Sequence, residues 1–202
     1  MAAISSLQDL FVQELRDAYD GEKQIIKALP KMAKAAESEE LASAFQEHLE
    51  QTRQQVERLE QIFTQLDMRP RGKHCAGLAG IIEEGGEVMD EVEEPALNSA
   101  LVAAAQRVEH YEIAAYGTLI AYARQLGHDD AAELLEETLN EEKETDQKLT
   151  ELAEGFLNAQ AKQGDSDDAE EQEEEVAKPT RARTMAAGAG AGRGASNTRG
   201  RK

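Results

Sequence analysis

The chain has 202 residues, a formal net charge of −19 and 4% aromatic residues, a composition that is typical of long helices and argues against a β-sandwich. Its negative charge repels nucleic acid and anionic lipids, and no apolar run reaches the roughly 18 residues that a membrane-spanning helix needs. Because the N-terminus shows no secretory signal and the single cysteine, Cys75, excludes an internal disulfide, we expect a cytoplasmic protein.

Four segments contain apolar residues at alternating steps of three and four, which predicts four long helices whose apolar stripes meet in a bundle. The stripes cover residues 11–36, 41–66, 101–126 and 131–156. Residues that begin or end helices agree with these limits, since Ser6 and Ser38 precede the first two stripes, Pro95 precedes the third and Gly127 follows it.

The second pair of stripes repeats the first in phase, so that Glu22 corresponds to Glu112, 90 positions later. Short turns make each pair antiparallel, whereas residues 68–95 must cross the length of the bundle and contain a short extra helix from Leu78 to Val92. One long crossover is the ferritin-like arrangement. The predicted fold is therefore all-α, a ferritin-like antiparallel four-helix bundle that occupies residues 1–157.

The segment 158–202 consists of an acidic block followed by a basic block rich in glycine and alanine. Neither block has enough apolar surface to offset the entropy of ordering, so we predict a disordered tail. Its basic block could contact nucleic acid weakly and without sequence preference, although a solubilising role is the simpler interpretation. Apart from such tail contacts we expect no nucleic-acid partner.

Polar side chains interrupt the middle of the apolar stripes. Glu22, His48, Glu112 and Glu142 occupy inward positions whose neighbours are Leu, Ala, Ile and Phe. Further polar residues of the stripes are Thr52, Gln55, Thr138 and Thr145. An unpaired carboxylate in a bundle core costs several kcal/mol, so these acids need a bound divalent cation or a network of hydrogen bonds and buried cationic groups.

A metal centre is the first of these explanations. The repeat-equivalent Glu22 and Glu112 are placed to bridge two metal ions, as single glutamates do in di-iron and di-manganese bundles. His48 would supply a nitrogen ligand for Fe or Mn, and Glu142 lies in the corresponding layer of the fourth helix. The remaining candidate ligands, each about one turn from a central glutamate, are Glu109 and Asp146. The chain contains no phosphate-binding glycine loop and no catalytic triad, so the sequence identifies no catalytic residue.

Four segments between residues 7 and 153 carry the motifs ELRDAYDGEKQIIKALPKMAKAA, FQEHLEQTRQQVERL, RVEHYEIAAYGTL and LLEETLNEEKETDQKLTELA. In these segments the chain resembles the YciE/YciF-type ferritin-like family of bacterial stress proteins. The resemblance implies a cytosolic homodimer that is associated with osmotic or oxidative stress and has a di-metal centre. Ferritin-like proteins usually carry Glu-x-x-His on the second and fourth helices, whereas this chain has Thr52 to Gln55 and Glu142 to Thr145 there. We therefore expect a carboxylate-rich site with one histidine, or a mononuclear site, and no storage cage.

Two functions follow from the two explanations of the buried acids. In the first, the protein binds Fe or Mn and reacts with peroxide or oxygen. In the second, the buried polar residues form a metal-free hydrogen-bond network, and a non-catalytic homodimer acts by binding a partner. Both remain open at the level of the sequence.

Overall fold

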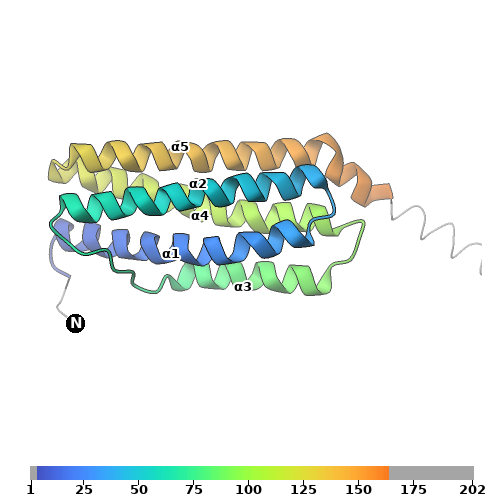
Figure 1. The fold of residues 1–202 in the computed structure, drawn as a ribbon, viewed down its shortest axis with the longest axis horizontal. Helices are drawn as coiled ribbons and strands as arrows, with labels where there is room; N and C mark the ends of the chain where they lie inside the picture. The colour runs from blue at the N-terminus through green and yellow to red at the C-terminus, as the bar shows by residue number, and fades with distance from the viewer. Residues whose placement is uncertain (1–3, 164–202) are drawn as a thin grey trace, which may run out of the picture.

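The computed structural model describes residues 4–163, which form a bundle of long helices with one shorter helix along its side (Figure 1). The helices are α1 (Leu7–Ala35), α2 (Glu39–Gln65), α3 (Ala76–Glu91), α4 (Leu97–Leu126) and α5 (Asp129–Leu152), followed by the π-helical segment η1 (Ala153–Leu157). The hairpins α1–α2 and α4–α5 pack against each other, and α3 lies against α1 and α4. The structure thus confirms the predicted ferritin-like bundle and the extra helix in its crossover.

Local sequence explains where the long helices begin and end. The Ser6 hydroxyl accepts a hydrogen bond from the Asp9 N–H at 3.1 Å, and the Asp9 carboxylate accepts one from the Ser6 N–H at 3.2 Å. Ser38 caps α2 in the same way by accepting from the Leu41 N–H. At the other end, α4 stops at Gly127, whose φ of 75° is a left-handed conformation that glycine adopts without steric cost.

The helix α3 approaches the bundle closely because glycines face it. A Cβ atom at Gly21 of α1 would lie 2.6 Å from Leu78 Cδ1, and one at Gly77 of α3 would lie 2.7 Å from Tyr111 Cε2. Both distances are shorter than van der Waals contact, so a side chain at either position would require Leu78 or the Tyr111 ring to shift. Leu78 and Gly85 are the residues of α3 that become fully buried.

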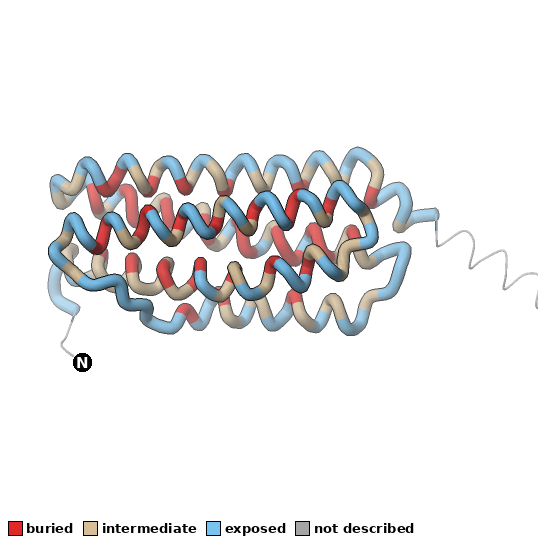
Figure 2. Tube along the Cα trace, in the orientation of Figure 1, coloured by how far each residue is buried: buried red, intermediate tan, exposed pale blue. Residues whose placement is uncertain are grey.

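The bundle core consists of two apolar clusters with a polar layer between them, and Figure 2 shows buried residues on the inward side of each long helix. One cluster includes Ile25, Leu29, Leu41, Phe45 and Leu101. The other includes Phe11, Leu15, Leu59, Leu119 and Leu135. Along every long helix the buried polar residues fall between these clusters in sequence, except Asn98 at the start of α4. The polar layer therefore lies near mid-height, where apolar side chains above and below enclose it.

The described chain remains helical through η1 and on to residue 163, beyond the predicted end of the bundle at residue 157. The rest of the predicted tail, residues 164–202, lies outside the described residues, as do residues 1–3. Within the described part, no helix combines the length and the apolar character that crossing a membrane requires.

Candidate metal centre

Three of the four long helices bring metal-ligating side chains to one point in the polar layer. His48 comes from α2, Glu109 and Glu112 from α4, and Glu142 from α5. One ligand atom of each residue lies within 4.8 Å of the ligand atoms of the other three, and all four residues are buried. This separation is short enough for one or two ions to contact the whole set. The fourth long helix, α1, contributes Glu22, which is also fully buried.

The two ring nitrogens of His48 have different surroundings. Nδ1 lies 3.3 Å from the hydroxyl oxygen of Thr145 on α5. Nε2 faces the carboxylates, at 3.3 Å from Glu109 Oε1 and 3.8 Å from Glu142 Oε2. A ligating histidine usually donates the hydrogen of its other nitrogen to an oxygen, which sets the tautomer and the orientation of the ring. Thr145 is placed for that role, because it leaves Nε2 free to bind a cation.

Burial changes the ionisation of three carboxylates of the layer, those of Glu22, Glu112 and Glu142. It raises the pKa of Glu22 to about 7, against the opposing effect of a hydrogen bond donated by the Tyr116 hydroxyl. Burial, reinforced by the neighbouring carboxylates, raises the pKa of Glu112 and that of Glu142 well above the ordinary value. For His48, burial lowers the pKa, but the Glu109 and Glu22 carboxylates and a hydrogen bond to Gln51 together raise it above the ordinary value. Without a cation, the layer therefore holds protons that exposed groups would have lost at neutral pH.

Unsatisfied polar atoms are concentrated in this layer. Within residues 4–163, nine buried side-chain atoms lack a hydrogen-bond partner, and six of them belong to the layer. The six are Glu22 Oε2, His48 Nε2, Glu109 Oε2, Glu112 Oε2 and both carboxylate oxygens of Glu142. Native proteins leave few buried polar atoms unpaired, so such a concentration indicates a partner that the polypeptide itself does not supply. The atoms are lone-pair donors of the kind that hold divalent cations.

The next layer toward the α4–α5 turn has a different character, because most of its polar groups bond to one another, with Gln55 Oε1 as the exception. The Arg58 guanidinium donates to Glu141 Oε2 at 2.7 Å and to the Thr138 hydroxyl at 3.2 Å. Gln55 Nε2 donates to the same Glu141 oxygen at 3.1 Å. Thr52 donates to the main-chain carbonyl of His48 at 2.8 Å. Hydrogen bonds and the Arg58 cation thus engage most of the polar groups of this layer, whereas the group around His48 keeps more unpaired atoms.

The structure places Asp146 apart from the other candidate ligands. Its Oδ1 accepts a hydrogen bond from Gln106 Nε2 at 3.0 Å and lies 3.3 Å from His110 Nε2. Its side chain is 23% exposed, whereas those of His48 and Glu109 are 3% and 2% exposed. Asp146 remains a predicted ligand, but it is not in the group that converges on His48.

Sequence reasoning left Tyr116 and Thr145 without an assigned contact. Tyr116 lies four residues after Glu112 and so on the same face of α4, which is the signal that could have placed its hydroxyl in the layer. Thr145 was recognised as an inward polar residue, but its contact with His48 depends on how α2 and α5 pack.

Two pockets approach the layer from opposite sides, and Glu109 lines both. The apolar pocket, about 280 Å³ in volume, lies between α1, α3 and α4. The polar pocket, about 130 Å³ in volume, lies between α2, α4 and α5 and includes His48. An ion pair between Lys148 and Glu47 lies among the residues that line the polar pocket. The group around His48 is therefore buried but can be reached from two sides.

Comparison with known proteins relates this geometry to a family. Residues 6–162 match the family described as "Domain of unknown function (DUF892)". Protein YciF of Escherichia coli is 46% identical over 160 residues, which cover 78% of this chain and 96% of YciF.

Solved structures agree with this relationship. The crystal structure of YciF, which is described as a stress protein, matches with a TM-score of 0.74 over 77% of this chain and 99% of YciF. The structure of YcfI from Rhodopseudomonas palustris is 47% identical, with a TM-score of 0.71 over 73% of this chain and 94% of YcfI. A protein from Xanthomonas campestris, 24% identical with a TM-score of 0.63 over 80% of this chain and 99% of its own, shares the fold. The motifs, the fold and these matches lead to one conclusion: the chain belongs to the DUF892 family of YciF-type stress proteins.

Proposed function

We propose that this protein is a cytoplasmic stress protein that binds iron or manganese in the middle of its bundle. The ligands are His48, Glu109, Glu112 and Glu142, with Glu22 as a further carboxylate of the same layer. The observation that supports this most strongly is the set of six buried, unsatisfied ligand atoms in one layer. Without a cation, these atoms would carry desolvation costs that the ion pair of His48 with Glu109 and retained protons offset only in part.

The donor set determines which metals fit. Several carboxylates with one imidazole suit Fe and Mn better than the softer metals, which prefer thiolates. A bound Fe or Mn ion would supply a Lewis-acidic, redox-active centre for peroxide or oxygen. The chain itself orients His48 through Thr145 and Glu22 through Tyr116. The apolar clusters above and below exclude water, and the polar pocket gives small hydrophilic molecules access to His48 and Glu109.

The second candidate function is a metal-free homodimer that acts by binding a partner. The satisfied network of Arg58, Glu141 and Thr138 favours it, because such networks can fix the register of packed helices. Formation of a homodimer is compatible with either function, and we propose it from the resemblance to YciF-type proteins. Light scattering of the purified full-length chain tests it directly.

Elemental analysis of the full-length protein purified from its own host tests the metal proposal, because overexpression can load a different metal. We expect about one to two Fe or Mn ions per chain. The double variant Glu112→Gln/Glu142→Gln should lose the metal, whereas Asp146→Asn, which alters a carboxylate outside the converging group, should retain it. Added metal should raise the melting temperature of the wild-type protein and not that of the double variant. Absence of metal after anaerobic reconstitution, with an unchanged melting temperature, would favour the metal-free homodimer.

A further inference from the structure

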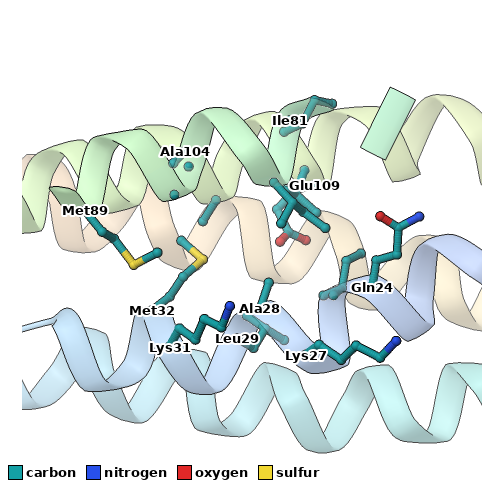
Figure 3. A pocket seen from close by; sticks show the side chains of 16 residues that line it. Gln24, Lys27, Ala28, Leu29, Lys31, Met32, Ile81, Met89, Ala104 and Glu109 are labelled. Atoms are coloured by element: carbon teal, nitrogen blue, oxygen red, sulfur yellow. The ribbon is translucent and has the colours of Figure 1, made fainter. Parts of the chain in front are cut away.

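The apolar pocket has the properties of a ligand site rather than of a packing defect. Its walls are the side chains of Leu29, Met32, Ile81, Met89 and Val108, among others. Figure 3 shows Met32 of α1 and Met89 of α3 extending into the same space, and the Glu109 carboxylate pointing from α4 toward α1. Methionine side chains are flexible and polarisable, so they adapt to apolar ligands of varied shape. One end of the pocket is thus the candidate metal centre, and the other is the protein surface.

Small residues of α3 and α4 leave this space open. A Cβ atom at Gly86 would meet nothing within 4 Å, and one at Gly85 would make only an ordinary contact of 3.6 Å with Ala104 Cβ. Any larger residue at position 86 would extend into space that now belongs to the pocket, since Gly86 is part of its lining. Gly86 is therefore a position of the lining at which a side chain would meet open space.

The mouth of the pocket is cationic on a strongly acidic protein. Lys27 and Lys31 are exposed, lie one turn apart on α1 and line the opening. Within residues 4–163, neither lysine forms an ion pair within 4.0 Å. Gln24, another polar residue of the wall, is already engaged with Asp20 and with the main-chain carbonyl of Cys75. Two unpaired ammonium groups beside an apolar cavity are complementary to a negatively charged group attached to a hydrocarbon.

We propose that the apolar pocket binds a single-chain amphiphile with an anionic head, of the chemical class of a medium-chain fatty acid. The carboxylate lies at Lys27 and Lys31, and the alkyl chain runs between Met32 and Met89 with its end toward Glu109. The reverse orientation would place a carboxylate against the buried carboxylate of Glu109, which repels it.

The volume of the pocket limits the length of the alkyl chain. A cavity of about 150 Å³ holds one benzene molecule, so the 280 Å³ found here suits a chain of about ten carbon atoms. The inference goes beyond the metal centre and does not require an ion to be bound.

Methionine methyl signals in NMR locate such a ligand, because Met32 and Met89 line the pocket while Met68 packs against the other apolar cluster. The full-length chain, labelled at its methionine methyl groups and with any paramagnetic ion exchanged for Zn²⁺, is titrated with decanoate. Metal content is measured in the same samples. We expect saturable shifts of the Met32 and Met89 signals and none of Met68. Decanoate should bind about tenfold more tightly than decyltrimethylammonium, and Lys27→Glu/Lys31→Glu should weaken decanoate binding about tenfold.

A matched pair of glycine variants separates filling of the pocket from effects on α3. Gly86→Leu places its side chain in the pocket and should abolish the shifts. Gly80→Leu, on the same helix and also with nothing within 4 Å of its Cβ, does not line the pocket and should preserve them. If Gly86→Leu does not fold, the head-group comparison and the exposed lysine variants still decide the matter.

Three results would overturn the proposal. The first is the absence of saturable shifts at Met32 and Met89, and the second is equal binding of the anionic and cationic amphiphiles. The third is that the Met32 and Met89 signals change with protein concentration instead of with decanoate, as expected if a second copy of the chain fills the pocket. If the samples contain bound metal but show no binding of decanoate, the ligand proposal is rejected and the proposed metal centre is not.

Discussion

Tyr116 of α4 donates a hydrogen bond to Oε1 of Glu22 of α1, and both side chains are enclosed at mid-height of the bundle. This bond joins the two helical hairpins through the polar layer. It also orients Glu22, whose other oxygen has no hydrogen-bond partner. The contact therefore links the stability of the bundle to the carboxylates of the candidate metal centre.

Replacing Tyr116 with Phe should destabilise the metal-free protein by about 1–3 kcal/mol, because it leaves a second oxygen of Glu22 buried without a donor. Urea denaturation followed by circular dichroism measures the change. Tyr19→Phe is the matched control, since Tyr19 donates to the partly exposed Glu60 at 2.7 Å and water can replace that bond. Equal losses in the two variants would mean that enclosure of the Tyr116–Glu22 contact has no energetic effect.

Replacing His48 with Ala should lower the affinity for Fe or Mn by at least about tenfold. Loss of a residue that only hydrogen-bonds to a metal ligand already lowers metal affinity by about that factor, and His48 is a proposed ligand itself. His110→Ala is the control, since His110 lies on the exposed side of α4 beside Asp146. Competition with a coloured chelator measures both affinities. A loss confined to His110→Ala would locate the ion beside Asp146 and contradict the site described above.

The metal-free protein should become less stable as the pH rises. Burial raises the pKa of Glu22 from 4.5 to about 7, and it raises the pKa values of Glu112 and Glu142 as well. The folded state then keeps protons that the unfolded state releases, so the contribution of these groups to the unfolding free energy is greatest below pH 4.5 and is lost as the pH rises through 7. The raised pKa of His48 acts in the same direction. A pKa shift like that of Glu22 changes the unfolding free energy by as much as about 3 kcal/mol.

Urea titrations in chelator between about pH 5 and pH 8 measure this slope. Glu22→Gln/Glu112→Gln is the control, because amides do not ionise and the slope should be shallower. Saturating metal should remove the loss, since the cation takes the place of the protons. A wild-type protein that grows more stable over this range would contradict the expected ionisation of the layer.

Replacing Gly77 with Ala should destabilise the protein by about 1–3 kcal/mol, because the new methyl group would overlap the Tyr111 ring. The phenol oxygen of Tyr111 lies 3.3 Å from the buried Cys75 thiol, which restricts any movement of the ring. Gly80→Ala is the control, since it meets nothing within 4 Å and should stabilise α3 by about 0.5–1 kcal/mol. Calorimetric melting measures both, and shifts of the same sign would contradict the close packing of α3 on α4.

The spacing of apolar residues was sufficient to predict the architecture and most of the candidate site. An α-helix turns by a constant angle per residue, so an apolar stripe determines which side chains face inward. For that reason Glu22, His48, Glu112 and Glu142 could all be predicted to lie inside, and all four are buried. The extra helix was predicted over 78–92 and is found as Ala76–Glu91.

The amino-acid sequence by itself determined the helices, their inward faces and the presence of acids among apolar neighbours, because each depends on one helix at a time. Tertiary structure alone showed which of Glu109 and Asp146 lies beside His48, since both lie about one turn from a central glutamate. In the folded chain Glu109 meets His48, whereas Asp146 meets Gln106 and His110. Tertiary structure likewise created the two pockets beside Glu109. The physical reason is that contacts between helices depend on the spacing and rotation of their axes, which the period of a single helix does not specify.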